Sequence, residues 1–238
     1  MKQVAQSGQA PNVWSVGDKI GIKLSGTVGA LKLNDTYYAF IIGFNHNASI
    51  EGNNTIHFQF GKTSDGTDIA FCDNYYGKTG SSAAFRMNTT NTNTGGWKDS
   101  YMRNTICPEL LNAMPSAWRN LIVSCTKYSD NTGGANNTLS YVTATQDKIF
   151  LLAEFEMLGT RHYANSAEQN FQKQYDYYKN GNSEMKYQHS STGTARTWWL
   201  RSVSVKVDSY FCVIGAVGGY NTWSAYISYG FAPGFMVA

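Results

Sequence analysis

Two carboxylates lie close together in the middle of the chain and are the first candidates for chemistry. Glu154 and Glu156 are two residues apart in a segment with strand character, which would put both carboxylates on one face. Paired carboxylates can act as a general acid and a general base. The surrounding sequence, FLLAEFEML, is nevertheless typical of a core segment with one polar edge. We therefore predict a structural role for both residues and no catalytic residue.

The histidines and cysteines show no spacing typical of a metal site or a reactive thiol pair. An Asn-His-Asn sequence around His46, directly after an apolar run, can carry a polar site but is typical of a hydrogen-bonded turn. His57 lies beside phenylalanines in a strand-like segment, where a hydrogen-bonded core histidine is expected. We predict no metal, no cofactor, and four reduced, mostly buried thiols. The residues concerned are His46, His57, His162, His189, Cys72, Cys107, Cys125 and Cys212.

The composition excludes several classes of function. Of the 238 residues, 42% are hydrophobic but only 15% are charged, so Asn, Ser, Thr, Gly and Tyr supply much of the polarity. This balance is typical of β-rich folds with long loops. The net charge of +3 comes from scattered basic residues, so we expect no nucleic-acid partner. No apolar stretch is long enough for membrane insertion, and no signal peptide is visible.

The first half of the chain shows strand patterns. Residues 19–33 alternate around Gly-containing breaks and predict a hairpin, and residues 37–44 form an apolar run that predicts a strand buried on both faces. Residues 55–73 alternate on both sides of Ser64-Asp65-Gly66, which predicts a second hairpin. The Asn- and Thr-rich segment 87–96 predicts an exposed loop.

Helical spacing appears in two places. Between residues 97 and 122 the apolar residues recur every three or four positions, and two prolines predict a pair of short helices that meet near Met114. Pro115 is expected in the first turn of the second helix. Residues 165–181 predict one longer helix, with Ser166 as its N-cap and Gly181 at its end. We therefore expect an α+β fold with a flexible leader, residues 1–12, and a single domain, residues 13–238.

The C-terminal segment, residues 197–238, combines large residues at its ends with an irregular polar filling. Its framework is expected to be buried and comprises Trp198, Trp199, Leu200, Phe211, Cys212, Pro233 and Phe235. Arg201 is expected to pair inside the domain. The filling mixes aromatic with small polar residues, as antibody binding surfaces do. The predicted ligand-binding residues are Val203, Val205, Val207, Asp208, Ser209, Tyr210, Val213, Gly215, Val217, Tyr220, Asn221, Thr222, Trp223, Ser224 and Tyr226.

The valines of this set have two interpretations. Val203, Val205 and Val207 alternate as in a strand, whereas as functional residues they would, with Val213 and Val217, form an apolar binding patch. The residue types alone leave the two interpretations about equal.

Several stretches in order along the chain carry a resemblance to a known group. They are "VWSVGDKIGIKL", "GTVGALKL" and "FIIGFNHN" near the start, "DKIFLLAEFEM" in the middle, and "TWWLRS", "FCVIGAVG" and "SYGFAPGF" at the end. Together they resemble the C-type-lectin-fold variable proteins of diversity-generating retroelements from bacteriophages and prophages of gut Firmicutes. The resemblance implies a C-type lectin fold, with short mixed β-sheets, two main helical regions and long loops. It also implies that side chains in a C-terminal variable region, about residues 197–238, are rewritten while the backbone stays constant.

The residue content of this region agrees with such rewriting. In this group the changes fall on adenines of Asn-type codons, which end in a pyrimidine and therefore cannot become Lys, Glu, Gln, Met or Trp. Between Ser202 and Phe235 there is no Glu, Gln or Met, and only Lys206 and Trp223 depart from the pattern. Those two positions would have fixed codons.

The functional expectation is a hypervariable receptor-binding protein without catalytic chemistry. The resemblance implies that it is phage-encoded, sits at a virion tail tip or a bacterial cell surface, and recognises a surface protein or glycan of a bacterial host. A homo-oligomer, by analogy a trimer, would raise its avidity. Two alternatives remain: a structural or assembly module, and an enzyme of the formylglycine-generating type, for which Cys125 and Cys212 are the only plausible reactive pair.

Overall fold

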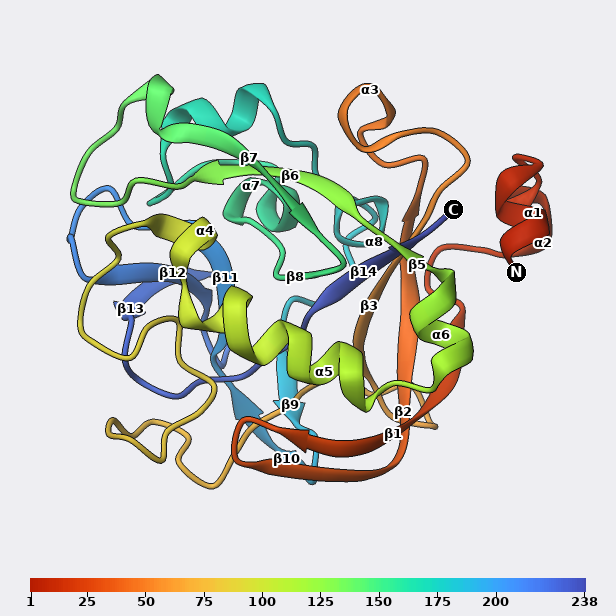
Figure 1. Cartoon of the computed structure of the whole chain (residues 1–238), viewed down its shortest axis with the longest axis horizontal. Helices are drawn as coiled ribbons and strands as arrows, with labels where there is room; N and C mark the ends of the chain where they lie inside the picture. The colour runs from red at the N-terminus through yellow and green to blue at the C-terminus, as the bar shows by residue number, and fades with distance from the viewer.

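The largest sheet brings together strands from both ends of the chain. The computed structural model describes residues 1–238 (Figure 1). The sheet is antiparallel, in the order β1-β2-β3-β14-β5, with β8 also paired to β14. Its strands are β1 (Lys19–Val28), β2 (Leu31–Phe44), β3 (Ile56–Lys62), β5 (Ile122–Val123), β8 (Ile149–Phe150) and β14 (Gly234–Val237). The C-terminal strand therefore lies inside the sheet, which explains why its residues are buried.

The first predicted hairpin is confirmed. β1 and β2 pair from Lys19–Phe40 to Val28–Leu31, so only Gly29 and Ala30 lie between the strands. Gly29 has a φ of +57°, a left-handed conformation that glycine adopts without a Cβ penalty. The predicted strand buried on both faces is also confirmed, because residues 39–43 of β2 are all buried.

The remaining strands form three smaller sheets. β9 (Lys186–Gln188) lies between β10 (Ser191–Arg196) and β4 (Ile69–Ala70), and β6 (Cys125–Asp130) pairs with β7 (Val142–Asp147). β11 (Trp198–Val203), β12 (Tyr210–Ile214) and β13 (Tyr220–Ser224) form the third sheet, in which β13 is an edge strand.

The second predicted hairpin is confirmed only at its turn. The chain reverses at residues 63–67, where the Thr63 N–H donates to the Thr67 carbonyl. Across this turn only one bridge forms, between Lys62 and Asp68. β4 pairs instead with β9, in parallel, so a partner far along the chain replaces the local one.

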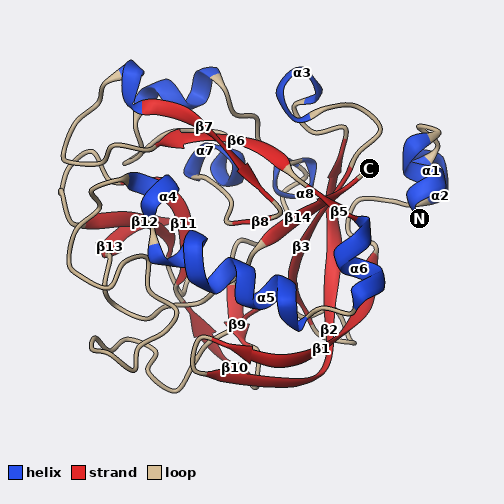
Figure 2. Ribbon diagram, viewed as in Figure 1, coloured by secondary structure: helices blue, strands red, loops and turns tan.

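The helices are short, and loops and strands make up most of the fold (Figure 2). The α-helices are α1 (Lys2–Gln6), α2 (Ala10–Val13), α3 (Ala48–Glu51), α4 (Gly96–Asp99), α5 (Cys107–Ala113), α6 (Ser116–Leu121), α7 (Glu154–Leu158) and α8 (Asp176–Lys179). A π-helical turn, η1 (Met102–Ile106), precedes α5, and η2 (Leu139–Tyr141) and η3 (Ser166–Asn170) are 3₁₀ turns. None of these helices combines the length and the apolar character needed to span a bilayer.

The predicted pair of helices around Met114 is confirmed. α5 ends at Ala113, Met114 adopts an extended conformation, and α6 begins at Ser116. Pro115 is the N-cap of α6 and not its first residue, so it stands one position before the predicted one. Because proline has no N–H to donate and restricts the residue before it, the break at Met114 follows from local chemistry.

The predicted long helix over residues 165–181 is wrong. The chain forms η3 and α8, separated by residues 171–175. The backbone of this interval bonds to distant partners: the Tyr175 N–H donates to the Glu156 carbonyl, and the Phe171 carbonyl accepts from the Asn47 side chain. These long-range bonds replace those that a continuous helix would make. The N-cap is Asn165, whose side chain accepts from the Ala167 N–H.

The first residues form two short helices where a flexible leader was expected. Ala5 of α1 and Ala10 of α2 are buried and belong to the same core as the rest of the chain. This core comprises 49 residues that run from Ala5 to Val237. It contains the predicted framework residues Trp198, Trp199, Leu200, Phe211, Cys212 and Phe235, and Pro233 is buried as well. The short helices and the four sheets confirm the α+β class.

Candidate functional site

The two adjacent tryptophans anchor the C-terminal segment. Trp198 and Trp199 of β11 are fully buried, and each ring N–H donates to a backbone carbonyl, of Glu184 (3.0 Å) and of Phe85 (2.9 Å). At the other end of the segment, the Phe235 ring stacks on Phe58 with centroids 5.2 Å apart. The segment between these anchors is therefore held at both ends by core packing.

Between the anchors, large side chains reach solvent on and beside the edge strand β13. Val217, in the β12–β13 turn, is 87% exposed, Tyr220 is 48% exposed and Trp223 is 39% exposed. In Figure 1, β12 and β13 lie at the opposite end of the molecule from α1, α2 and both termini. We call residues 207–210, 215–223 and Tyr226 the aromatic surface.

The structure divides the predicted ligand-binding residues into two groups. Eleven are exposed or half-buried and belong to the aromatic surface, namely Val207, Asp208, Ser209, Tyr210, Gly215, Val217, Tyr220, Asn221, Thr222, Trp223 and Tyr226. The other four, Val203, Val205, Val213 and Ser224, are buried and present no surface to a ligand. Val203 and Val213 lie in β11 and β12 and face the core. β11 ends at Val203, so the predicted alternating strand does not continue to Val205 and Val207, which lie in the loop before β12.

A histidine that the sequence did not suggest supports this surface. His162 stacks on Tyr220, with ring centroids 3.3 Å apart and ring planes 7° apart, and Tyr163 lies beside them. Glu154, fully buried, accepts hydrogen bonds from the N–H groups of His162, Tyr163 and Ala164. The loop under Tyr220 is therefore held by a carboxylate of α7.

The two central glutamates do not share a face. Because they lie in α7 and not in a strand, their side chains diverge: Glu154 binds the 162–164 backbone, and Glu156 binds Arg201. The predicted structural role therefore stands, but the strand geometry from which the pairing was inferred is wrong.

Asn93 holds the loop that carries the first part of the aromatic surface. Its side-chain amide donates towards the carbonyls of Ser204, Val207 and Tyr210 at 3.1–3.3 Å, and its backbone N–H donates to the Asp208 carbonyl. Asn93 is fully buried although the surrounding segment 87–96 was predicted to be an exposed loop. Nothing in its sequence context distinguishes it from the neighbouring asparagines.

A buried ion-pair network lies behind the frame. Arg201, predicted to pair inside the domain, is fully buried and donates to Glu156 at 2.7 Å, while Lys127 donates to Glu156 at 3.2 Å and to Glu51 at 2.9 Å. Burial alone would raise the pKa of Glu156, but Arg201 and Lys127 outweigh it and lower the pKa. In the same way burial raises the pKa of Glu51, but Lys127 and the contact with His46 lower it to about 2. Both glutamates are therefore charged.

The network also brings together three side chains that can hold a metal ion. One ligand atom from each of His46, Glu51 and His57 lies within 4.8 Å of the others, and all three residues are buried. Burial lowers the pKa of His57 to about 3, so this ring is neutral. The spacings of five and six residues along the chain match no common metal motif, which is why the sequence predicted none.

Glu168 gives the domain a pH-dependent stability. Burial raises the pKa of its carboxyl from 4.5 to about 7, against opposing hydrogen bonds from Ser202 and Asp130. Since the folded protein keeps this proton longer than the unfolded chain, its contribution to stability is complete below pH 4.5 and is lost as the pH rises through 7. Glu168→Gln cannot ionise. Between about pH 5 and 8 the unfolding free energy of the wild type should therefore fall more than that of this variant, by on the order of 2–4 kcal/mol.

Urea unfolding at a series of pH values measures this difference. Glu184→Gln, which removes a half-exposed carboxylate, is the control and should keep the wild-type slope. Equal slopes for wild type and Glu168→Gln would contradict the assignment.

The fold and the site together define a mixed α+β domain in which a buried frame carries an exposed aromatic surface. The chain belongs to the DUF6273 family, described as a domain of unknown function, whose sequence profile matches residues 74–238. The matched region contains the whole aromatic surface, whereas β1, β2 and β3 precede it. Neither the search of curated proteins nor the search of solved structures found a match.

Proposed function

We propose that this chain is a binding protein that recognises its partner through the aromatic surface. The observation that carries the proposal is the exposure of Val217, Tyr220 and Trp223 on a frame whose anchors are fully buried. Tyr and Trp provide large contact areas at a low cost in side-chain entropy, and binding energy concentrates on them. Because the backbone is held from below, these side chains can be changed without loss of the fold.

The resemblance to variable proteins of diversity-generating retroelements supports a more specific form of this proposal. In it, the domain has a C-type lectin fold, belongs to a phage or prophage, and presents the aromatic surface at a virion tip or a bacterial cell surface. The partner is then a protein or glycan on a bacterial host, bound by surface complementarity with no covalent step. The position of both termini at the end opposite β13 supports this orientation, since a structure joined to either terminus would leave the aromatic surface free (Figure 1).

A triple variant tests the surface directly. Tyr220→Ala, Trp223→Ala and Tyr226→Ala together should weaken binding to intact bacterial cells at least about a hundredfold, since each such anchor contributes ~2 kcal/mol or more. The melting temperature should stay nearly unchanged, because these side chains lie outside the core. Flow cytometry with labelled protein on a panel of gut Firmicutes measures binding, and thermal unfolding measures stability.

The matched control changes exposed apolar residues on other elements. Val13→Ala with Leu139→Ala removes two side chains that are 56% and 59% exposed and lie outside the aromatic surface. This control should bind as wild type does. Equal loss in both variants, or unfolding of the triple variant, would overturn the proposal. Sequencing the DNA downstream of the coding region is a separate test. A near-copy of the last codons that differs at adenines and lies beside a reverse transcriptase gene would identify the varied positions.

The two alternative functions predict different results. An assembly module would lose oligomers in the triple variant, which light scattering detects, and would bind no cells. A formylglycine-generating enzyme would need reactive thiols. Burial raises the pKa of Cys125 to about 12 and that of Cys212 well above its usual value, so neither forms a reactive thiolate readily. Thiol titration of the folded protein should therefore be slow at both.

A further inference from the structure

His46 occupies a position that a neutral imidazole cannot satisfy. Its Nδ1 lies 2.9 Å from a carboxylate oxygen of Glu51, and its Nε2 lies 2.9 Å from the Lys173 carbonyl oxygen. Both partners only accept hydrogen bonds, and a neutral imidazole has a single N–H. One of the two contacts therefore needs a further positive charge, either a second proton on the ring or a cation between the two atoms.

The surroundings of His46 match those of a metal-binding histidine. In such residues one ring nitrogen binds the ion and the other donates to a carbonyl or carboxylate, which fixes the ring orientation. Donation from Nε2 to the Lys173 carbonyl leaves the Nδ1 lone pair directed towards Glu51 Oε2. The ring is also held by stacking on Tyr175, with centroids 3.7 Å apart.

A third ligand atom approaches the same place. Nδ1 of His57 lies 3.7 Å from Glu51 Oε2, so this oxygen stands between the two imidazoles. His57 is fully buried and its Nε2 has no hydrogen-bond partner. The one hydrogen-bond partner of its Nδ1 is the Tyr175 hydroxyl, at 3.1 Å. The two nitrogens and the oxygen thus converge from α3, β3 and the turn after β2.

We propose that His46, Glu51 and His57 form a binding site for a divalent transition-metal ion. Two imidazole nitrogens and one carboxylate oxygen are a ligand set that Zn²⁺ accepts, whereas Ca²⁺ and Mg²⁺ prefer oxygen ligands alone. The ion holds the turn at residues 45–47 to α3 and β3. The Lys173 carbonyl, as partner of His46, links this centre to the interval 171–175.

The site lies within a buried and already balanced set of charges. Lys127 binds the other oxygen of Glu51, Oε1, and leaves Oε2 free for the ion. Lys127 and Arg201 together balance the charges of Glu51 and Glu156. A bound ion adds positive charge to this balanced set, so its affinity must come from direct bonds to the two imidazoles and to Oε2.

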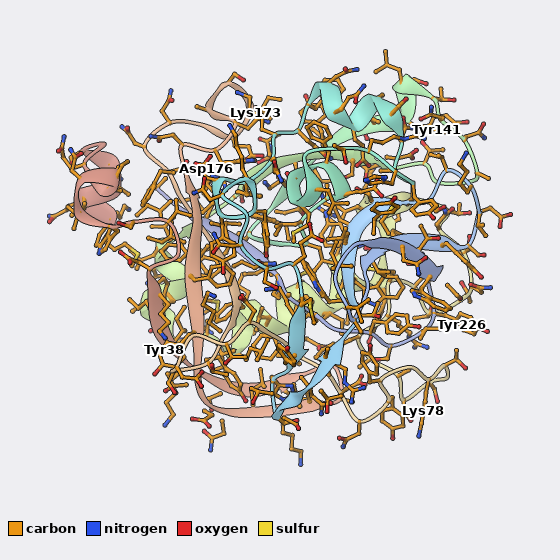
Figure 3. The ribbon with its side chains drawn as sticks, turned by 180° about the vertical axis from the view of Figure 1, so that it is seen from behind. Tyr38, Lys78, Tyr141, Lys173, Asp176 and Tyr226 are labelled. Atoms are coloured by element: carbon orange, nitrogen blue, oxygen red, sulfur yellow. The ribbon has the colours of Figure 1, made fainter.

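Of the three ligands, His46 alone borders a surface cavity. The residue lines a cavity of about 490 Å³ whose other walls include Asn45, Lys173, Asp176 and Lys179. Figure 3 shows Lys173 and Asp176 near the outside of the molecule, on the side away from Tyr226. The cavity therefore brings solvent to His46 on a side of the molecule away from Tyr226.

Zinc titration of the full chain, prepared without a histidine tag and stripped with EDTA, tests the proposal. Calorimetry and elemental analysis after dialysis against Zn²⁺ should give one ion per chain, and Zn²⁺ should raise the melting temperature. His57→Gln should weaken binding at least about tenfold, as expected for a lost ligand. His189→Gln, which changes a half-buried histidine outside the cluster, should bind as wild type does.

The outcomes are distinct. Absence of bound Zn²⁺ in the folded wild-type chain would overturn the proposal and leave the cluster as a proton-held ion-pair network. Equal weakening in His57→Gln and His189→Gln would overturn the assignment of ligands. If His57→Gln does not fold, Glu51→Gln keeps the shape of the carboxyl group and tests the oxygen ligand. ¹¹³Cd²⁺ can replace Zn²⁺ as a probe for nuclear magnetic resonance. Its chemical shift in the wild-type chain should then report nitrogen ligands.

Discussion

Arg201→Met should lower the unfolding free energy by about 3–5 kcal/mol, as expected when one partner of a buried ion pair is removed. Arg201 is fully buried and its guanidinium binds both oxygens of Glu156, the Leu151 carbonyl and the Ser129 hydroxyl. Methionine fills a similar volume but donates no hydrogen bond. Glu156 would keep Lys127 and the Ala153 N–H as partners but lose its bidentate one, and the Leu151 carbonyl would lose the Arg201 donor.

Urea unfolding at neutral pH measures this loss. Arg119→Met removes an arginine that makes one exposed hydrogen bond, to the Asn112 carbonyl, and should change the stability by less than about 1 kcal/mol. The double variant Arg201→Met, Glu156→Gln removes both charges and should lose less than the sum of the single variants, because no uncompensated carboxylate remains. Additive losses would show that Arg201 and Glu156 do not act as a pair.

Local patterns predicted those parts of the fold that local chemistry decides. The hairpin of β1 and β2 follows from alternation around a glycine that adopts positive φ. The break before α6 follows from Pro115, and burial of Trp198 and Trp199 follows from their size. In each of these cases the stabilising contacts lie within a few residues or depend on hydrophobicity alone.

The wrong predictions have a common physical origin in long-range polar contacts. Residues 165–181 have helical spacing, but the Tyr175 N–H donates to the Glu156 carbonyl and the Phe171 carbonyl accepts from the Asn47 side chain, in place of the bond that a regular helix would make between them. From the sequence, His46 and His57 were likewise interpreted as two separate histidines, although the pairing of β2 with β3 brings them together. Such partners lie on different elements of the fold, and no spacing rule connects them.

Buried polar residues hold the loops of the aromatic surface from below. Glu154 binds three backbone N–H groups of the 162–164 loop, and Asn93 binds the carbonyls of the 204–210 loop. Because the backbone groups of both loops are satisfied by the domain, the exposed side chains contribute little to stability. This separation is what a surface with changeable side chains requires.

Asn93→Asp should therefore lower the unfolding free energy by about 3 kcal/mol or more. This loss should exceed that caused by substituting an exposed side chain of the aromatic surface. The carboxylate keeps the oxygen that accepts from the Gly134 N–H. Its second oxygen, however, replaces an amide that faces three carbonyl oxygens at 3.1–3.3 Å. Repulsion among these acceptors should release residues 204–210.

Hydrogen exchange and urea unfolding together measure the effect of this change. The amides of Val205 and Tyr210, which donate to backbone carbonyls in the wild type, should exchange faster in Asn93→Asp. Asn136→Asp adds the same charge at an exposed position and should leave both measurements unchanged. At acid pH the new carboxyl gains a proton and can donate to one of the carbonyls, so part of the loss should be recovered. Wild-type protection of this loop in Asn93→Asp would show that other contacts hold it.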